Sequence, residues 1–437
     1  MKALSVKRIC WCVWIGIWCI APANIVLPEE PAGGARNKGT VPVTGSADRA
    51  MRPLDELMVS FVRRQEIPGA ALAVAHGGQL IYARGFGYAD REAKCPVAPD
   101  ALFRIASISK PITAITILRL VDKGRLRLDD SVLEHLPADL RPAPGELADR
   151  RWEKITIRHL LQHRGGWDRA ESIDCMFYPV EIATALGTPP PAGARQIIRF
   201  MQRWPLDFDP GERYAYSNFG YCLLGRVIEQ LTGRPYERYV QEDVLRPLHI
   251  ERMRIGRTLR CGRAPGEVVY YTRKQRRAVS VFPPKVGHPV APPYGAWHLE
   301  AMDSHGGWIA SAPDLVRFGS AVVASPGNGL LSAAMRRAML ERPPGAAGND
   351  AAGKPKDAYY GLGWFVRPAR DGRPTAWWHT GSLPGTSTLL VLRDDGWCWA
   401  VLFNTRETTA GKRPAVLIDR DLHRTIDRIS KARAEAD

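Results

Sequence analysis

The sequence FRIASISKPITAITILRLV occupies residues 103–121 and joins an extended segment to an apolar run. Its first part has the pattern of an extended segment, and the apolar positions within 112–121 predict a largely buried helix. Gly124 then ends the helix as a C-cap glycine would. Ser107 stands at the junction, near the positive end of the helix, and Lys110 follows one helical turn later on the same face.

A serine three residues before a lysine points to nucleophilic catalysis. A serine hydroxyl is a weak nucleophile near neutral pH and needs an adjacent base. A lysine amine can be that base when burial lowers its pKa, and Lys110 leads directly into the buried helix. The same spacing also arises by chance at solvated helix starts. Ser107 and Lys110 therefore need support from elsewhere in the chain.

A second motif, Tyr216-Ser217-Asn218, directly precedes a predicted amphipathic helix at 219–231. A phenol beside an ammonium can share its proton, and a carboxamide can hold both a lysine and a substrate amide. Asn218 taken alone is equally typical of a helix cap. This motif therefore indicates a catalytic site only in combination with Ser107 and Lys110.

A third motif, His379-Thr380-Gly381, lies at the end of a predicted strand and is followed by Ser382. Gly381 would let a substrate backbone approach closely, and a strand edge offers N–H groups to it. A histidine at a strand end is also common as a purely structural residue.

Strand patterns occur towards both ends of the chain. Residues 69–74 and 79–85 predict a hairpin around a glycine turn, and short segments within 363–404 predict an antiparallel meander. A closing helix is expected at about 414–429. We predict an α/β fold of the α+β type, with one antiparallel sheet built from both terminal regions and flanked by helices. A mostly helical lobe would be inserted at about 125–300.

The N-terminal residues predict export. Basic residues precede an apolar run at 9–20, and small residues at 21–23 fit a cleavage site. We expect a signal peptide at 1–23, a linker at 24–53 and one catalytic domain at 54–430. The protein would then be periplasmic or secreted. The alternative is an uncleaved N-terminus that anchors the protein in the membrane.

The composition fits a globular protein, since the 437 residues are 45% hydrophobic and 24% charged. The net charge is +16, and loss of the three basic residues of the predicted signal peptide leaves +13. Such a charge suits nucleic acid or anionic envelope polymers. No basic cluster interleaved with aromatics, zinc finger or recognition helix is present, so we predict no nucleic-acid partner.

Cysteines and histidines suggest two further features. Five cysteines follow the predicted signal peptide, and Cys175 and Cys261, in loop-like stretches, are candidates for a disulfide. His159 and His163 have the spacing of zinc ligands on a helix. Leu160 stands where H-E-x-x-H hydrolases have glutamate, so we predict neither a metal nor a cofactor. The absence of G-x-S-x-G argues against an α/β-hydrolase.

The three motifs, in this order, resemble those of class C β-lactamases and penicillin-binding proteins. The resemblance covers about residues 54–425 and includes further matching stretches at 103–113, 160–163, 210–225, 306–308 and 361–364. It implies the fold of that superfamily, the β-lactamase/transpeptidase fold. It also implies a hydrolase that forms a covalent acyl-enzyme.

The resemblance also implies a role for each motif residue. Ser107 would be the acylated nucleophile, Lys110 its proton partner and Tyr216 the general base. Asn218 would orient the lysine and the substrate amide. The backbone N–H groups of Ser107 and Ser382 would form the oxyanion hole.

His379, Thr380 and Gly381 would bind substrate, but His379 departs from the family pattern. β-Lactamases and D,D-peptidases have a lysine there, which helps to hold the substrate carboxylate, whereas a histidine is mostly neutral at pH 7. The histidine variant is more similar to esterases, D-amino-acid amidases and peptidases of the family.

We therefore predict a serine hydrolase that cleaves an ester, an amide or a D-amino-acid peptide bond. One alternative is a true β-lactamase or D,D-carboxypeptidase. The other is a catalytically inactive, penicillin-binding-like envelope protein. The expected partner is a small-molecule or peptide substrate, cell-wall peptides included. Any membrane contact would come through an uncleaved N-terminus.

Overall fold

The computed structural model describes residues 40–143, 145–273, 277–324 and 329–435. The predicted signal peptide and most of the predicted linker lie outside these ranges. The end of the predicted linker is folded, however, because β1 (Val43–Thr44) pairs with β3 (Gln79–Asp90) and α2 (Arg52–Arg64) starts before residue 54. The compact unit begins at Val41, so the predicted boundary at 54 is wrong. Buried Met51 explains the early start, because it joins the core from a stretch without apolar periodicity.

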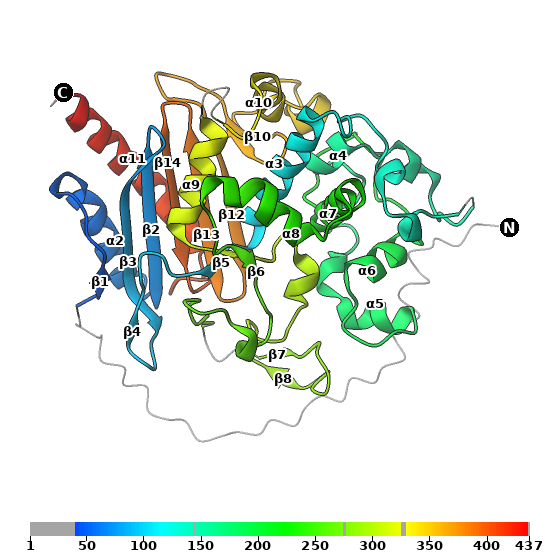
Figure 1. Cartoon of the computed structure of the whole chain (residues 1–437), viewed down its shortest axis with the longest axis horizontal. Coiled ribbons are helices and arrows are strands. Elements are labelled where there is room, and N and C mark those ends of the chain that lie inside the picture. The colour runs from blue at the N-terminus through cyan, green and yellow to red at the C-terminus, as the bar shows by residue number, and fades with distance from the viewer. Residues whose placement is uncertain (1–39, 144, 274–276, 325–328, 436–437) are drawn as a thin grey trace. The chain divides into compact units, whose positions relative to one another are not determined.

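One antiparallel sheet of nine strands forms the centre of the described residues (Figure 1). The predicted hairpin is β2 (Gly69–His76) with β3, and the meander is β12 (Ala376–Leu383), β13 (Thr386–Arg393) and β14 (Trp397–Phe403). β14 pairs with β2, from Trp397 opposite His76 to Phe403 opposite Ala70. The sheet therefore joins strands from both ends of the chain, which confirms the predicted fold class.

The remaining strands lie at the edges of the sheet or outside it. The full order is β1-β3-β2-β14-β13-β12-β11-β10, with β4 beside β3. Here β4 is Cys95–Pro96, β10 is Tyr359–Tyr360 and β11 is Phe365–Arg367. A small sheet contains β5 (Phe103–Arg104), β9 (Trp308–Ala310) and β6 (Arg254–Ile255), and β7 (Ala278–Val279) pairs with β8 (Pro289–Val290).

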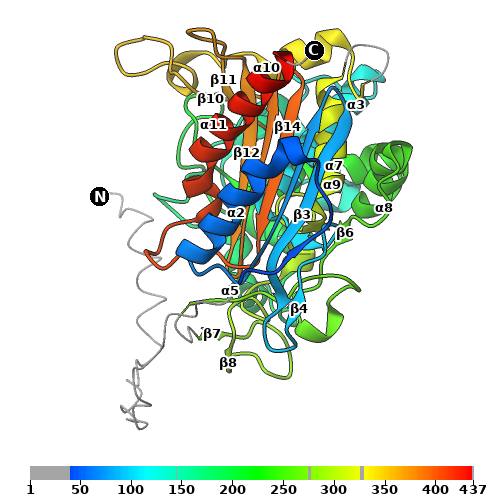
Figure 2. The ribbon, with the colours of Figure 1, turned by 90° about the vertical axis from the view of Figure 1, so that its left-hand side faces the viewer.

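Helices cover both faces of the sheet. On one face, α2 and α11 (Pro414–Ala434) pack against the core that contains Leu72 and Val74 (Figure 2). On the other, α9 (Ala312–Val323) lies against β2 and β14, on the side of Ala71 and Ala73. Because both faces are buried, β2 is apolar at nearly every position.

The inserted lobe lies on the α9 side of the sheet (Figure 1). It contains α4 (Ile157–Leu161), α5 (Pro179–Ala185), α6 (Ala194–Met201), α7 (Asn218–Thr232) and α8 (Tyr236–Val240), joined by loops and 3-10 turns. α3 (Ser109–Asp122) packs against α7 and α8 and is buried along most of its length. α10 (Ala333–Leu340) follows α9. α3 therefore carries the residues that follow Ser107 into the core between sheet and lobe.

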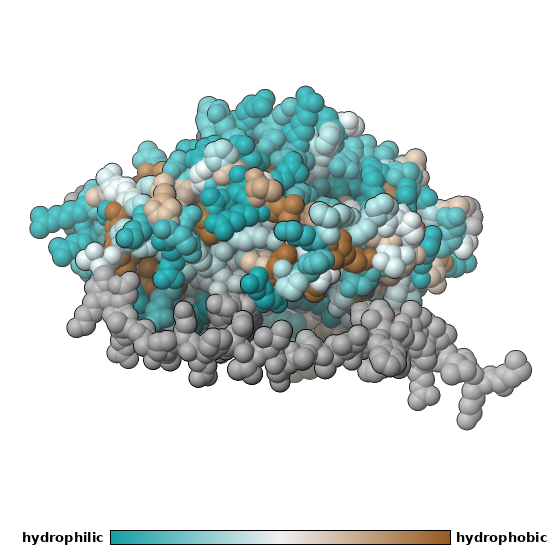
Figure 3. Space-filling model, turned by 90° about the horizontal axis from the view of Figure 1, so that it is seen from below, coloured by the Kyte–Doolittle hydropathy of each residue, from teal (hydrophilic) through white to brown (hydrophobic). Residues whose placement is uncertain are grey.

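The remaining features of the fold concern the surface of the protein and the state of its cysteines. On the face shown in Figure 3, hydrophobic residues form separate patches among hydrophilic ones. No helix in the described ranges is long and apolar enough to cross a bilayer. The predicted disulfide is not formed: Cys175 is a free thiol buried in the core, whereas Cys261 is a free thiol at the surface.

Candidate active site

Ser107 lies in a 3-10 turn, Ala106–Ile108, that leads directly into α3. Ala106 has a φ of 47°, which turns the chain sharply just before the serine. The hydroxyl of Ser109 donates a bond of 2.7 Å to the Ala106 carbonyl and stabilises this turn. The α-helix therefore begins at Ser109, two residues after the predicted junction at Ser107. Ser107 lies on the turn that precedes it.

Strands β12 and β13 hold the segment before Ser107. Thr386 donates a bond of 2.8 Å to the carbonyl of Arg104, and Thr388 donates one of 2.9 Å to the carbonyl of Ile105. At Gly381 of β12, a Cβ atom would overlap the Ile105 oxygen and the Thr388 hydroxyl. The absence of a side chain at Gly381 therefore lets the nucleophile segment approach β12 closely.

The side chain of Lys110 is fully buried and faces three oxygen atoms. Its Nζ lies 2.7 Å from Oδ1 of Asn218, 2.9 Å from the carbonyl of His305 and 3.4 Å from Oγ of Ser107. Burial holds the pKa of Lys110 well below its usual value, with Asp174 opposing the shift. A neutral amine has two hydrogens and one lone pair. With both hydrogens donated to the two carbonyl oxygens, the lone pair remains for the Ser107 hydroxyl.

Tyr216 lies on the other side of the nucleophile. Its side chain is hydrogen-bonded to Ser107, and its ring centre lies 4.7 Å from Nζ of Lys110. Burial raises the pKa of Tyr216 above its usual value, which outweighs the lowering by the Ser107 bond. The phenol therefore keeps its proton at neutral pH and can donate it.

Asn218 is the first residue of α7, but it does not cap the helix. Ser217 is the cap, because its hydroxyl accepts the N–H of Gly220 at 3.3 Å. The Asn218 amide is therefore available to the site. Its Oδ1 accepts from Lys110, and its Nδ2 donates a bond of 2.7 Å to Asp174.

The third motif differs from the prediction. His379 is 1% exposed, and both ring nitrogens are engaged: Nδ1 lies 2.8 Å from the Thr380 carbonyl and Nε2 lies 3.0 Å from the Tyr360 hydroxyl. Since a carbonyl only accepts, Nδ1 carries the proton and Tyr360 donates to Nε2. Burial, with a smaller contribution from Lys110, lowers the pKa of His379 to about 3.

A cavity of about 360 Å³ opens beside Ser107. His379, Thr380 and Gly381 are not among its lining residues, and the predicted substrate-binding role of these three residues stays a prediction. Their neighbour Ser382 does line it, as the predicted oxyanion hole requires. The other lining residues are mainly apolar and include two arginines and one histidine: Ala106, Arg169, Phe177, Tyr216, Asn218, Ala278, Pro292, Ala296, Trp297, Met302, His305, Gly306, Leu383, Pro384 and Arg406.

Four residues near the cavity escaped the sequence analysis. Arg169, Asp174, His305 and Arg406 lie in loops or just after a strand, outside the three motifs. Arg169 places its guanidinium 5.0 Å from the ring centre of Tyr216 and 3.8 Å from the carboxylate of Asp174. The only available signal was the Gly306-Gly307-Trp308 match, which adjoins His305.

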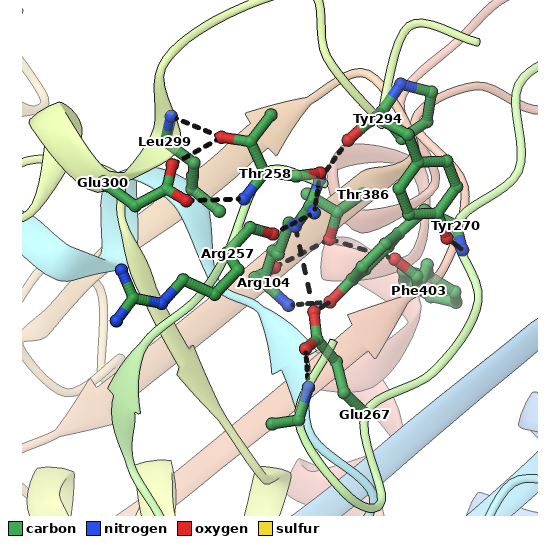
Figure 4. Close-up of polar contacts among 12 residues, drawn as sticks. Arg104, Arg257, Thr258, Glu267, Tyr270, Tyr294, Leu299, Glu300, Thr386 and Phe403 are labelled. Carbon is green, nitrogen blue, oxygen red and sulfur yellow. Dashed lines mark hydrogen bonds and ion pairs between the residues drawn. The ribbon is translucent and has the colours of Figure 1, made fainter. Parts of the chain in front are cut away.

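Arg104, three residues before Ser107, makes polar contacts with Arg257, Thr258 and Glu267 (Figure 4). Its guanidinium donates to the carbonyls of Pro293 at 2.6 Å, Arg257 at 2.7 Å and Thr258 at 3.1 Å. It also lies 4.5 Å from the ring centre of Tyr270.

A second set of contacts closes this network. Glu267 lies 3.8 Å from Arg104 and accepts the Tyr270 hydroxyl at 2.7 Å, and the same hydroxyl accepts the backbone N–H of Arg104 at 2.8 Å. Pro292, beside the Pro293 carbonyl, and nearby Ala296 line the cavity. The described part of the stretch 255–300, whose role the sequence did not reveal, therefore contributes residues to the cavity wall and is fixed to the nucleophile segment.

His159 and His163 do not form the helical pair that zinc would need. α4 ends at Leu161, and His163 has a φ of 55°, outside the helix. Nδ1 of His159 accepts the N–H of Thr156, and Nδ1 of His163 accepts the N–H of Ser217. Within the described ranges, no cluster of three or more metal-binding side chains occurs.

The comparisons with known proteins agree with this geometry. A family model described as Beta-lactamase matches residues 49–422. Esterase EstB of Burkholderia gladioli is 35% identical over 210 residues, which are 45% of this chain and 49% of that protein. Protein flp of Staphylococcus aureus (strain COL) is 29% identical over 202 residues, 46% of this chain and 37% of that protein. The matches thus span half or less of these relatives' length.

Solved structures show the same fold. An octameric penicillin-binding protein homologue from Pyrococcus abyssi has a TM-score of 0.62 at 25% identity, over 83% of this chain and 74% of that one. A D-amino acid amidase from Ochrobactrum anthropi SV3 has a TM-score of 0.65 at 21% identity, over 88% of this chain and 100% of that one.

Proposed function

The chain belongs to the Beta-lactamase family, and on this basis we propose that it is a serine hydrolase. It would cleave an ester, an amide or a D-amino-acid peptide bond through an acyl-enzyme on Ser107. The observation that carries the proposal is the environment of Lys110. Two carbonyl oxygens accept its N–H groups, and its third neighbour is the Ser107 hydroxyl.

The reaction begins with proton transfer from Ser107 to neutral Lys110 as Oγ attacks the substrate carbonyl carbon. The resulting oxyanion lies within reach of the N–H groups of Ser107 and Ser382, whose residues line the cavity. When the tetrahedral intermediate collapses, Tyr216 protonates the leaving group and recovers a proton from Lys110. Tyr216 thus acts as a proton donor and relay, whereas the resemblance had implied a general base.

Deacylation uses the same groups, with the proton transfers in the reverse direction and water in place of the leaving group. Water gives up a proton to the Lys110–Tyr216 pair as its oxygen attacks the acyl carbon. Collapse of the second intermediate returns a proton to Oγ of Ser107 and releases the acid. Each half-reaction therefore restores the starting protonation states, and no cofactor enters the balance.

Ester and amide substrates are favoured over β-lactams by the third motif. His379 is neutral and buried, so it supplies no positive charge to a substrate carboxylate. The names of two similar proteins, an esterase and a D-amino acid amidase, point in the same direction. The contacts among Ser107, Lys110, Tyr216 and Asn218 disfavour an inactive envelope protein.

We also propose that the protein is exported and acts in the periplasm or outside the cell, on small molecules or peptides that include cell-wall peptides. This rests on the N-terminal sequence pattern, which lies outside the described residues. Cell fractionation and N-terminal sequencing of the mature protein test it. A start near residue 24 is expected for the cleaved form.

Covalent labelling tests the proposed activity. Purified protein should react with a fluorophosphonate, and the Ser107→Ala variant should not react while keeping its thermal unfolding transition. Hydrolysis of p-nitrophenyl butyrate, nitrocefin and D-Ala-D-Ala peptides then ranks the substrates. Equal labelling or turnover by folded Ser107→Ala would refute the assignment.

A further inference from the structure

The carboxylate of Asp174 lies behind the catalytic groups and belongs to none of the three motifs. It accepts the Asn218 amide N–H at 2.7 Å, and the other end of that amide accepts from Lys110 at 2.7 Å. Its side chain is 16% exposed, and it does not line the cavity. One amide group thus connects a carboxylate outside the cavity to the amine beside Ser107.

We propose that Asp174 is a positioning residue for the acyl transfer suggested above. By holding Nδ2 of Asn218, it fixes which end of the amide faces Lys110. This inference rests on the proposed serine hydrolase activity and adds to it the residue that orients the base.

The argument begins with the two ends of an amide. The oxygen accepts hydrogen bonds and the nitrogen donates them, whereas an ionised carboxylate only accepts. Asp174 therefore selects the orientation in which Oδ1 of Asn218 points at Lys110. In the flipped orientation, Nδ2 would donate to the lysine lone pair. That lone pair would then be occupied and could not take the proton of Ser107.

Charge provides a second, independent effect. Asp174 raises the pKa of Lys110, whereas burial and the nearby guanidinium of Arg169 lower it. In the described part of the chain, Asp174 is the one carboxylate with a resolved effect on Lys110. The aromatic groups closest to the amine, Tyr216 and Tyr221, both have raised pKa values because of burial, so they stay neutral.

Three histidines also surround the amine and carry no charge at neutral pH. His163, His305 and His379 all have lowered pKa values, first because of burial and then because of Lys110. Removing the charge of Asp174 should therefore lower the pKa of Lys110. The amine would become neutral at a lower pH.

Two variants separate orientation from charge. Asp174→Asn keeps an oxygen that can accept from Asn218 but removes the charge, whereas Asp174→Ala removes both. Asp139→Asn is the matched control, because Asp139 is also a lobe carboxylate paired with arginines, Arg195 and Arg199, and does not line the cavity. The readout is the second-order rate constant for fluorophosphonate labelling of Ser107 between pH 5 and pH 10, beside the thermal unfolding temperature.

We expect the acidic limb of the labelling profile to move down by about half a pH unit or more in Asp174→Asn. Its plateau should stay within about threefold of wild type. Asp174→Ala should show the same shift of the acidic limb and should lose about tenfold or more on the plateau. Asp139→Asn should match wild type in both respects.

A profile of Asp174→Asn that superimposes on wild type, with Asp174→Ala equally reactive, would overturn the inference. So would equal shifts in Asp139→Asn. Because Asp174→Asn is nearly isosteric, the test stands even if Asp174→Ala fails to fold. Failure of wild type itself to label at Ser107 would instead contradict the proposed activity.

Discussion

The hydroxyl of Tyr360 donates a hydrogen bond of 3.0 Å to Nε2 of His379. This bond occupies the ring nitrogen that would otherwise be free to meet a substrate. The other nitrogen is committed to the carbonyl of Thr380. His379, the first residue of the third motif, is thus buried with both ring nitrogens hydrogen-bonded within the protein.

Restoring a lysine at this position should therefore not restore β-lactam recognition. In His379→Lys, the new ammonium would be buried near Lys110 and would lose the Tyr360 bond. We expect no gain in acylation by a fluorescent penicillin and a loss of about 2 kcal/mol or more in the free energy of unfolding. Urea unfolding and labelling rates measure both. A tenfold gain in acylation without loss of stability would show that the side chain reaches the cavity.

Lys110 and Tyr216 should behave as one unit. Lys110→Ala removes the base, and Tyr216→Phe removes the proton donor that Lys110 reprotonates. Each variant should therefore lower kcat/KM for p-nitrophenyl butyrate by about 100-fold or more. The kcat/KM of the double variant should be little lower than that of the less active single variant, because Lys110 and Tyr216 serve the same proton transfer. Multiplicative losses would mean that the two groups act independently.

Although His379 offers no charge to a substrate carboxylate, two arginines at the cavity should favour anionic ester substrates. Arg169 and Arg406 line it, and no carboxylate does among the described residues. We expect p-nitrophenyl hydrogen glutarate to be hydrolysed faster than neutral p-nitrophenyl butyrate. Arg406→Gln should reduce this ratio of kcat/KM values about threefold to tenfold, and 0.5 M salt should reduce it in wild type.

A matched control for this prediction is Arg424→Gln. Arg424 is an exposed arginine on α11, outside the cavity. Its replacement lowers the net charge equally and should leave the ratio unchanged. Equal ratios in wild type and Arg406→Gln would show that Arg406 does not contact the substrate carboxylate.

Buried histidines should make the protein unstable in mild acid. Burial lowers the pKa of His379 to about 3 and of His159 and His423 to about 4, and it lowers those of His163 and His305 well below normal. In the unfolded chain these groups bind protons near pH 6.5. The unfolded state therefore binds more protons, and stability falls as the pH drops below about 6.5.

Each of these histidines contributes about 1.4 kcal/mol per pH unit below that point. Three carboxyl groups with raised pKa values, Asp174, Glu267 and Asp419, oppose the trend at lower pH. Urea unfolding at pH 7.5, 6 and 5 measures the slope. A free energy of unfolding that stays constant from pH 6.5 to pH 5 would contradict the buried, neutral state of the histidines.

Features with a local sequence pattern could be predicted. The hairpin, the meander and the helices α3, α7 and α11 have hydrophobic periodicity or turn residues, so their predicted ranges were correct to within about five residues. Ser107, Lys110, Tyr216 and Asn218 could be grouped because three short motifs occur in a fixed order. Their mutual contacts come from the packing of α3 against α7, which joins two segments about 110 residues apart.

Features that depend on distant partners could not be predicted. Asp174 lies in a loop without a recognisable motif, and its connection to the site becomes visible only in its hydrogen bond with Asn218. The burial of His379 depends on Tyr360 across the β10–β12 edge of the sheet, and Gly381 depends on the Ile105 carbonyl. The disulfide prediction considered only the loop-like setting of Cys175 and Cys261, and the structure buries one thiol and exposes the other.

The nucleophile segment is held by residues that are synthesised much later. β14 pairs with β2, and Thr386 and Thr388 donate hydrogen bonds to the nucleophile segment. During synthesis, Ser107 leaves the ribosome long before residues 386–403 exist. A nascent chain thus carries its reactive serine without the strands that hold it in place, and such long-range pairing forms late. The contacts around Ser107 therefore cannot be complete until residues 386–403 have been made.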